Sequence, residues 1–414
     1  MRKVSTPSHP PHAVRDSNDL LEVIEAAVAH KTKLDIRGHG SRLGQGRPID
    51  ADQIITLDGL NGITTYEPDE LVMIVKSATP MVDLLKALDD AGQMLAFDPP
   101  LGGLTHQDAK GTIGGVVATN ASGPRRMVAG AARDYLLGFN AISGRGESFK
   151  SGSRVMKNVT GYDLSKLLAG SFGTLAVMDE ITLKTMPKPE DAVCMLIRCK
   201  DEADAARVLR KAFDSAYEPT TGAIIPTKTA IFSANKTVKD FIKTGAMAAI
   251  RLEGFSISVN DRMVALTDLL SEHGEITVLN KSDADQLHAE LREVSFLPVQ
   301  NNRVTWKISC PPAKGGELLA ELLKRPNCRG YADWGGGLIW LSHPSGVDGG
   351  ADVLRQMLAP IGGHATLIIA PEAMRSAVDV FQPQPAPLIE LSRRVKASFD
   401  PLGVLNPGRM YEGI

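Results

Sequence analysis

The sequence predicts an α+β protein with two main domains and a C-terminal segment. Its 414 residues suggest two or three domains at about 100–200 residues each. Strand-like and helix-like segments are mixed along the chain, without the long regular βαβ spacing of a doubly wound sheet. Pro187 and Pro189 interrupt the pattern near the middle, and further prolines interrupt it at 383–387. We therefore expect domains at 1–188 and 189–382, and a segment at 383–414 that returns to the first domain.

The elements of the first domain follow from local patterns. Residues 17–31 predict a helix with Ser17 as N-cap, because apolar side chains recur on one face at helical spacing. Residues 79–92 predict a second helix, with a proline in its first turn and a glycine at its end. Strands are expected where β-branched residues gather between turn signals, at 33–37, 53–60, 62–68 and 71–78. Further on, residues 135–153 resemble two strands joined by a GRG turn, and residues 174–187 two short strands or one bent strand.

In the second domain, strand-like runs alternate with amphipathic helices. The runs at 192–200 and 247–256 are each associated with a helical pattern, and the same order recurs from residue 303. This alternation resembles a small sheet with helices on one face, built from a loosely repeated βαβ or ferredoxin-like unit. A final helix is expected at 388–400, before the terminal `PLGVLNPGRMY`.

Composition and charge exclude several classes of function. The net charge of −2, with both signs mixed along the chain, gives no basic face for nucleic acid. No apolar run approaches the length of a membrane span, and the leader, with His9 and His12, lacks the apolar segment of a signal peptide. Four cysteines show neither CxxC spacing nor a neighbouring histidine cluster, which favours buried thiols in a reducing cytosol over an iron–sulfur site, namely Cys194, Cys199, Cys310 and Cys328.

A first loop of small residues, `RGHGSRLGQG` at 37–46, directly follows a predicted strand. A GxG sequence there invites a dinucleotide-binding interpretation of the βαβ type, but Gly44, Gly46 and Pro48 prevent the helix which that fingerprint must open. The loop is better explained as an anion-binding turn, with successive main-chain N–H groups directed at phosphate oxygens. Arg37 and Arg42 would add positive charge. A flexible turn is the alternative.

A second run of small residues spans 110–130, `KGTIGGVVATNASGPRRMVAG`. Glycines let a backbone approach a ligand closely, and hydroxyl groups of Thr and Ser donate to phosphate. Neither Asp nor Glu occurs between Lys110 and Ala132, as an anion pocket requires. The alternative is close packing of this segment against a helix, which explains the glycines but not their coincidence with Thr, Asn and Ser.

A third loop lies within residues 159–183, `VTGYDLSKLLAGSFGTLAVMDEITL`. Gly170, Gly173 and Thr174 stand between a short helix and a strand, where backbone amides would hydrogen-bond the edge of a ring system. A plain helix-to-strand turn explains Gly170 but not the whole segment. The three loops in this order carry more weight together than any one of them alone.

These motifs, with the terminal `FDPLGVLNPGR`, resemble the flavoproteins of the vanillyl-alcohol oxidase type, which carry a PCMH-type FAD-binding domain. The resemblance covers about half of the chain, at 14–188 and 396–410. The stretch `KNVTGYDLSKLLAGSFGTL` is most similar to FAD-binding E subunits of bacterial glycolate oxidase. The resemblance implies a two-subdomain FAD-binding domain and a ferredoxin-like α+β cap domain.

The resemblance also implies where FAD binds. The amides of 37–43 and 111–115 would cradle the pyrophosphate, other residues of the second loop would line the path to the flavin, the third loop would contact the adenine side or ring edge, and the chain end would return to the site. The residues implied are Arg37, Gly38, His39, Gly40, Ser41, Arg42, Leu43, Gly111, Thr112, Gly114, Gly115, Thr119, Asn120, Ser122, Gly123, Gly173, Thr174, Leu175, Val177 and Asn406.

Two departures from the family pattern matter. The position matching the histidine that some relatives bond to flavin is Ser41 rather than His39, so we expect non-covalent FAD. Relatives that oxidise 2-hydroxy acids also carry a histidine-rich metal motif in the cap region, and nothing like it stands in this chain. His343 and His364 are isolated, so no metal site is predicted.

The resemblance implies an FAD-dependent oxidoreductase acting on a CH–OH group, as one subunit of a cytoplasmic glycolate oxidase (dehydrogenase) complex. Glycolate would be oxidised to glyoxylate, with a second flavoprotein subunit and an iron–sulfur subunit as partners that allow peripheral association with the membrane. No catalytic residue is assigned; Arg303 and Lys307, on one predicted strand, are candidates for binding a substrate carboxylate. The alternatives are a stand-alone FAD oxidoreductase of another hydroxy acid or alcohol, and a non-catalytic assembly subunit.

Overall fold

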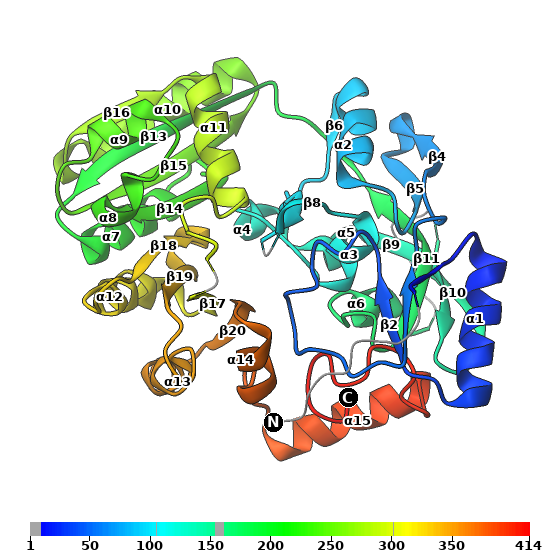
Figure 1. Ribbon diagram of the computed structural model, residues 1–414. Helices are drawn as coiled ribbons and strands as arrows, with labels where there is room; N and C mark the ends of the chain where they lie inside the picture. Colours follow the sequence, from blue (N-terminus) through cyan, green and yellow to red (C-terminus); the bar gives the residue numbers. More distant parts are fainter. Residues whose placement is uncertain (1–9, 105, 154–160, 301) are drawn as a thin grey trace. The chain divides into compact units, whose positions relative to one another are not determined.

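The computed structural model describes residues 10–104, 106–153, 161–300 and 302–414, which form two compact units. The first unit comprises 1–122, 131–187 and 375–414, and the second comprises 123–130 and 188–374 (Figure 1). The expected boundary after 188 lies one position from this division, whereas 123–130 joins the second unit and the C-terminal return begins at Arg375. The leader at 1–9, which includes His9, and the start of the third loop, Val159 and Thr160, lie outside the described residues.

The first unit begins with a small parallel sheet packed against one helix. Strand order is β1-β3-β2, from His12–Ala13, Gln53–Thr56 and Leu34–Arg37. Helix α1, Ser17–His30, buries Leu20 and Ile24 against this sheet. The N-cap is Asp16 and not Ser17 as expected, because the Asp16 carboxylate accepts the N–H groups of Asn18 and Asp19, both at 2.9 Å.

A five-stranded antiparallel sheet forms the larger part of the first unit, in the order β10-β9-β11-β5-β4. These strands span Ser148–Gly152, Leu136–Ser143, Ala176–Lys184, Val72–Lys76 and Ile63–Glu67. The GRG turn joins β9 to β10 as expected. Residues 174–187 contain the long strand β11, which has two register shifts against β9, and a separate two-residue strand at 186–187. Its core packs against helices α2, α3, α5 and α6, at Met81–Asp90, Ile113–Ala118, Ala132–Tyr135 and Leu164–Leu168.

Short elements complete this unit. The turn η1 is Pro68–Glu70, and two two-stranded ladders pair β6 with β12 and β7 with β8, at Gln93–Met94, Met186–Pro187, Gly102–Gly103 and His106–Lys110.

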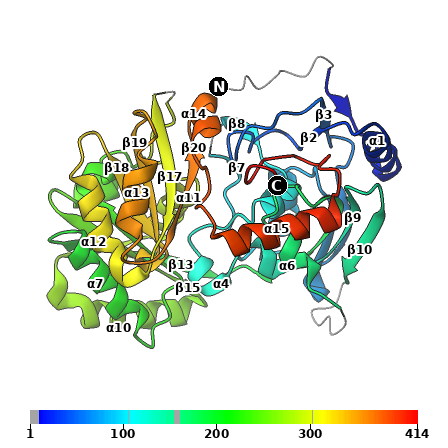
Figure 2. The same ribbon diagram turned by 90° about the horizontal axis from the view of Figure 1, so that it is seen from below.

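The chain end returns to the first unit through α15, Ala386–Phe399, whose ribbon runs alongside it in Figure 2. Buried Lys396 anchors the helix, because its ammonium donates to Asp400 Oδ2 at 2.6 Å and to the carbonyls of Thr174 and Leu405 at 2.6 and 2.9 Å. A bridge between Leu34 and Leu405 continues the contact to the parallel sheet. The C-terminal segment thus returns to the first unit as expected from the sequence, and the buried ion pair of Lys396 and Asp400 holds it there.

The second unit is built on one eight-stranded antiparallel sheet, in the order β16-β13-β15-β14-β18-β19-β17-β20. Its first four strands are β13 Asp191–Cys199, β14 Thr221–Pro226, β15 Ala246–Gly254 and β16 Ile276–Leu279. The last four are β17 Arg303–Ser309, β18 Arg329–Asp333, β19 Leu338–Pro344 and β20 His364–Ile369. Each set follows the ferredoxin-like βαββαβ order, and the two repeats join edge to edge where Ile224 pairs with Ala332.

Helices α7, α10 and α12 gather on one face of this sheet (Figure 2). They span Glu202–Phe213, Ser256–Leu270 and Pro312–Leu323. The remaining elements are α4 Arg126–Ala129, α8 Thr227–Ala230, α9 Lys236–Phe241, η2 Ser271–His273, α11 Lys281–Arg292, η3 Trp334–Gly336, α13 Ala351–Leu358 and α14 Glu372–Ala377. The α+β prediction is confirmed, and the expected ferredoxin-like repetition is present as two complete repeats.

Candidate cofactor-binding site

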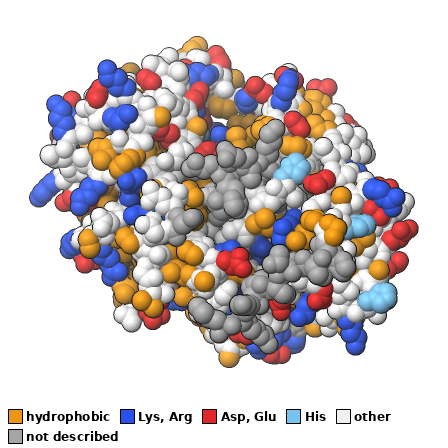
Figure 3. All heavy atoms as spheres, in the orientation of Figure 1, with side chains coloured by type: hydrophobic (Ala, Val, Ile, Leu, Met, Phe, Trp, Pro, Cys, Tyr) orange, Lys and Arg blue, Asp and Glu red, His pale blue; other side chains and the backbone are white. Residues whose placement is uncertain are grey.

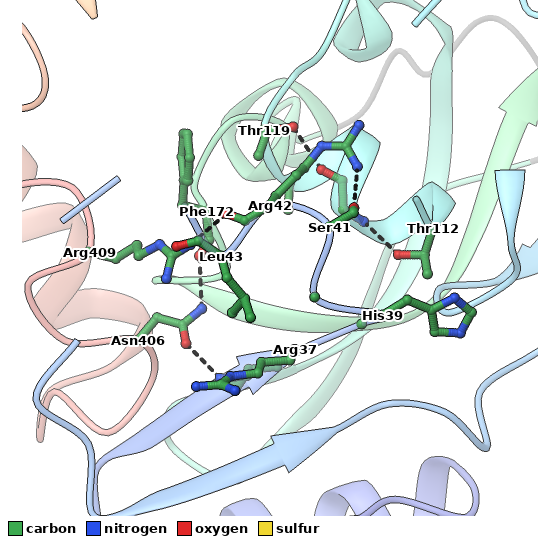
Figure 4. Close-up of a pocket in the computed structure, with 15 residues that line it drawn as sticks. Arg37, His39, Ser41, Arg42, Leu43, Thr112, Thr119, Phe172, Asn406 and Arg409 are labelled. Atoms are coloured by element: carbon green, nitrogen blue, oxygen red, sulfur yellow. Dashed lines mark hydrogen bonds between the residues drawn. The ribbon is translucent and has the colours of Figure 1, made fainter. Parts of the chain in front are cut away.

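A pocket in the first unit gathers four segments that lie far apart in the sequence (Figure 4). They are the first loop after β2, the start of α3 in the second loop, the end of the third loop, and the chain end. Two adjoining hollows share the central lining and together form one site. The shared lining residues are Ile36, Gly38, Thr112, Gly115, Ala118, Phe172 and Asn406.

The first loop presents bare main chain to this pocket. A Cβ at Gly38 would stand 2.7 Å from the Thr112 hydroxyl, and Gly40 has a φ of +75°, so a side chain at either position would force the neighbouring chain to shift. Among the described residues, no hydrogen bond engages the main-chain N–H groups of Gly38, His39 and Gly40. Three consecutive donors lining a pocket are the arrangement expected of an anion-binding turn.

The second loop contributes differently from the expectation. The N–H groups of Gly111, Ile113 and Gly114 donate to carbonyls of the protein itself, at 3.1, 3.1 and 2.7 Å. A Cβ at Gly111 or Gly114 would meet the main-chain oxygens of Leu101 or Ser77 at 2.3 and 2.7 Å. Four of the five amides expected to form the cradle at 111–115 are therefore engaged within the protein, that of Gly115 by the Thr112 hydroxyl, and close packing, the alternative, accounts for Gly111 and Gly114.

Gly115 and the threonines of the same loop do line the pocket. The Thr112 hydroxyl caps α3 by accepting the Gly115 N–H at 3.2 Å, and the Thr119 hydroxyl donates to the Gly115 carbonyl at 2.8 Å. A Cβ at Gly115 would meet only side-chain atoms, of Arg42 and Thr112, both at 3.4 Å. This glycine leaves the pocket open, whereas its neighbour Gly114 is required by packing.

The third loop is held in an unusual backbone conformation at the pocket wall. Phe172 has a φ of +55°, between Gly170 at +90° and Gly173 at +68°. Its N–H donates to the Ala118 carbonyl at 2.8 Å, and its ring packs 5.2 Å from that of Phe381, measured between centroids. Such strain in a non-glycine residue persists only where surrounding contacts over-determine it, and it is common at ligand sites.

Asn406 connects the chain end to two of the loops. Its side-chain oxygen accepts the Ile36 N–H at 2.8 Å, and its side-chain amide donates to the Phe172 carbonyl at 2.9 Å (Figure 4). The main-chain N–H of Asn406 donates to the Leu34 carbonyl at 3.0 Å. One side chain thus fixes the end of β2, which leads into the first loop, against the third loop.

Positive charge surrounds the first loop. Arg409 is buried and donates to the Arg42 carbonyl at 2.9 Å, and burial lowers its pKa to about 10. Arg42 is also buried, and Arg375 donates to the Gly46 carbonyl at 2.9 Å. Arg37 pairs with Asp35 through a 2.9 Å contact from Nε. The arginines at this end of the pocket outnumber its carboxylates, which favours an anionic ligand such as a pyrophosphate.

The hollow lined by Ser77 and the end of the third loop has a polar group without a partner in the described part of the chain. The Ser77 hydroxyl is buried and has no hydrogen-bond partner among the described residues, and Ser77 lines this hollow. A buried unpaired hydroxyl is costly, so a bound polar group would stabilise this site. Bare amides, arginines and an unpaired hydroxyl together fit a dinucleotide with two phosphates.

Most of the residues implied by the resemblance come together here. The pocket includes all seven of the first loop and Asn406, together with Thr112, Gly114, Gly115, Thr119, Gly173 and Val177. Six do not line it, namely Gly111, Asn120, Ser122, Gly123, Thr174 and Leu175. Asn120 instead accepts the Arg133 N–H at 3.0 Å, the Thr174 hydroxyl donates to the Ser171 carbonyl at 2.7 Å, and the Gly123 carbonyl accepts Trp334 Nε1–H at 3.0 Å within the second unit.

Sequence reasoning missed eight lining residues, which are Ile36, Leu57, Ser77, Ala118, Phe172, Ala176, Met178 and Arg409. Arg409 ends the `LNPGR` motif, so the motif itself carried a signal for it. Phe172, an aromatic residue between two glycines, also had a local signal. The others are small or apolar side chains, in strands, in α3 or directly after a strand, and their pattern indicates only burial.

The described residues hold neither a metal centre nor a membrane span. No three His, Cys, Asp or Glu side chains gather within them, and none of their helices is long and apolar enough to cross a membrane. His343 Nδ1 lies 2.7 Å from the Pro344 carbonyl, and burial lowers the pKa of this imidazole. The four cysteines are unpaired, and burial raises the pKa of Cys194 and Cys199 to about 12, which keeps both as thiols. On the surface drawn in Figure 3, basic and acidic side chains are interspersed.

Comparisons with known proteins agree with this site. Residues 12–152 match the family described as "FAD binding domain". Glycolate oxidase subunit GlcE of Escherichia coli (strain K12) is 33% identical over 95% of this chain and 97% of its own. A D-lactate dehydrogenase of Archaeoglobus fulgidus is 25% identical over 95% of this chain and 89% of its own.

Among solved structures, 4-ethylphenol oxidase from Gulosibacter chungangensis superposes with a TM-score of 0.70 at 15% identity, covering 96% of this chain and 88% of that one. For p-cresol methylhydroxylase the TM-score is 0.69 at 15% identity, with 96% and 87% covered. At this identity the two structures show a shared fold, in which an FAD-binding domain is combined with a large antiparallel sheet.

Proposed function

The chain belongs to the FAD-binding flavoproteins of the vanillyl-alcohol oxidase (PCMH) type, and we propose that it is the FAD-binding subunit of a glycolate oxidase complex. It is an FAD-linked oxidoreductase related to glycolate oxidase GlcE and to D-lactate dehydrogenases. The observation that carries the proposal is the convergence of the first loop, α3, the third loop and Asn406 on one pocket. The 33% identity to GlcE over nearly the full length of both chains supports the narrower assignment.

The pocket residues divide into two roles toward FAD. The N–H groups of 38–40 and the guanidinium of Arg42 would hold the pyrophosphate. The ring system would be lined by Phe172, Gly173, Ala176, Val177 and Met178. Bound FAD would supply the hydride acceptor for oxidation of the alcohol carbon of a 2-hydroxy acid. The chain itself supplies binding, orientation and the electrostatic surroundings.

We propose that FAD is held without a covalent bond. Ser41, which occupies the position matched to the flavin-linked histidine of some relatives, is buried in the first loop and hydrogen-bonded by Arg42 at 3.2 Å. Serine has no imidazole nitrogen, so it cannot form the histidyl–flavin bond of those relatives. Acid denaturation of the yellow protein is expected to release all flavin to the supernatant, and colour retained on the polypeptide would contradict this part.

The partners are proposed from chemistry as well as similarity. Iron–sulfur clusters are held by several converging cysteine thiolates, and the described residues hold no group of three His, Cys, Asp or Glu side chains that could bind a metal. Electrons would therefore pass to a partner subunit that supplies a cluster, alongside a second flavoprotein subunit. The name of the GlcE relative, a glycolate oxidase subunit, supports assembly in a complex.

One experiment tests this assignment against its alternatives. The chain is purified alone and together with candidate partner subunits, and the flavin spectrum is recorded before and after anaerobic addition of glycolate. Bleaching only in the mixture supports the complex subunit. Bleaching by glycolate or D-lactate in the isolated chain supports a stand-alone 2-hydroxy acid dehydrogenase; D-lactate is included because the Archaeoglobus fulgidus relative is named a D-lactate dehydrogenase. A chain that remains colourless after incubation with FAD contradicts both.

A further inference from the structure

In the second unit, Lys307 stands between two indole rings on β17. Its Nζ lies 5.1 Å from the Trp334 ring centroid and 5.7 Å from that of Trp340. The register places Lys307 opposite Trp340 on β19 and Thr366 on β20, so these three side chains share one face of the sheet. Arg303, the other carboxylate candidate on this strand, uses its guanidinium on the Asn327 and Ser342 carbonyls, at 2.8 and 2.9 Å.

The Lys307 ammonium makes no hydrogen bond or ion pair with any residue in the described part of the chain. The side chain is only half-buried, yet it is flanked by nearly buried aromatic surfaces. Contact with a ring face stabilises a cation, but it offsets only part of the loss of hydration. An ammonium in such surroundings keeps its hydrogen-bond donors for a ligand.

The charged groups around Lys307 make the place positive. Arg126 of α4 lies over the Trp334 ring at 5.0 Å, and His364 begins β20 opposite Ser309. The pKa of Lys307 is lowered to about 8, chiefly by burial and then by the Arg126 charge, while the Asp333 charge opposes both effects. Burial and the charges of Lys307 and Arg126 also lower the pKa of His364. Asp333 accepts the Trp334 N–H at 2.7 Å.

We propose that Lys307 anchors an anion subsite that takes the carboxylate of a small 2-hydroxy acid, with Trp334 and Trp340 as its walls and Arg126 adding charge. This inference rests on the proposed function and names the group that would recognise the substrate. A single ammonium between two apolar walls suits a compact monoanion, since the charge of one carboxylate balances that of the ammonium through a charge-assisted hydrogen bond. If Lys307 only packs against the two rings, its replacement should not change glycolate affinity. If it binds the carboxylate, its replacement should weaken that affinity.

The test uses the full chain with bound FAD, titrated with glycolate. Binding is followed by calorimetry and by tryptophan fluorescence, because all three tryptophans lie in the second unit and two of them flank Lys307. Lys307→Gln is expected to weaken glycolate binding about tenfold or more, since a hydrogen bond to a charged group contributes about 1.5–3 kcal/mol. Lys307→Arg keeps the charge and is expected to stay within a few-fold of the wild type.

The matched control is Lys314→Gln, which removes an exposed lysine of the same unit that pairs with Glu317 and is expected to leave binding unchanged. Glycolamide, the uncharged analogue, is expected not to compete with glycolate. Equal glycolate affinity in wild type and Lys307→Gln, with unchanged unfolding, overturns the inference, and so does a wild-type chain that holds FAD but does not bind glycolate. If Lys307→Gln does not fold, Arg126→Gln decides, since it must weaken glycolate binding by a smaller factor. Failure to bind FAD overturns the proposed function instead.

Discussion

Two adjacent glycines of α3 are expected to separate the stability of the first unit from its affinity for FAD. A Cβ at Gly114 would lie 2.7 Å from the main-chain oxygen of Ser77 and 3.0 Å from its Cβ, inside a contact that a hydrogen bond already fixes. A Cβ at Gly115 would meet the Arg42 and Thr112 side chains at 3.4 Å, an ordinary distance, on the wall of the pocket. Alanine at each position therefore probes a different property.

The magnitudes follow from these distances. Overpacking costs about 1–3 kcal/mol, and alanine in place of glycine recovers up to about 1 kcal/mol of helix propensity. Gly114→Ala is thus expected to destabilise the protein without FAD by about 1–2 kcal/mol. Gly115→Ala is expected to leave that stability unchanged or slightly higher. Its added methyl group would narrow the cofactor pocket, at a cost of about 1–3 kcal/mol, or about 5- to 150-fold in FAD affinity.

Urea unfolding of the cofactor-free chain, followed by far-ultraviolet circular dichroism, measures stability, and quenching of flavin fluorescence measures FAD binding. The two variants control each other, because they make the same chemical change one residue apart on one helix. If Gly115→Ala binds FAD as tightly as the wild type while remaining fully folded, the pocket described here does not hold the cofactor. A fully stable Gly114→Ala would refute the packing explanation of that glycine.

Three further predictions concern buried and half-buried charges. Lys396→Met leaves the carboxylate of Asp400 buried and unpaired, so the urea midpoint seen by circular dichroism is expected to fall by the equivalent of about 3–5 kcal/mol, whereas the exposed change Lys86→Met leaves it unmoved. Glu253→Gln removes the charge that pairs with Arg125 and Arg251 and is expected to destabilise the second unit by about 3 kcal/mol, measured by tryptophan fluorescence during unfolding. Glycolate affinity is expected to fall as the pH rises through about 8, because burial lowers the pKa of Lys307 and its ammonium loses its charge above that pH. The titratable and charged groups around it are Arg126, Asp333 and His364. Lys307→Arg should retain affinity at higher pH.

The sequence predicts elements well where their determinants are local. Helical periodicity located α1, and the GRG turn located the β9–β10 hairpin, because both depend on residues within one segment. The local pattern predicts Ser17 as the N-cap of α1. In the structure the Ser17 hydroxyl donates to Asp179 Oδ2 at 2.6 Å, and Asp16 caps the helix instead. That partner lies 162 residues away, so no local pattern could reveal it.

In the candidate site, too, the sequence predicts the residues whose role is local and not those whose role depends on distant contacts. All seven predicted residues of the first loop line the pocket. Sequence could identify them because the glycines leave the main chain bare and the arginines add positive charge at the pocket itself. In the second loop, glycines required by internal packing and glycines required by the pocket have the same sequence signature. Gly114 packs on Ser77 and Gly115 leaves the pocket open, a distinction that depends on what lies across from each.

The chain end explains why this pocket can form only in the completed fold. Asn406 accepts a hydrogen bond from Ile36, 370 residues away, and donates one to Phe172, 234 residues away. Closing such long loops costs conformational entropy, so neither bond can hold the loops until α15 is docked. Lys396 and Asp400, buried at the end of that helix, supply this docking by binding the Thr174 and Leu405 carbonyls and the Val404 and Leu405 N–H groups. The cofactor pocket is therefore coupled to the docking of α15, and losing Lys396 should weaken FAD binding even though this side chain does not line the pocket.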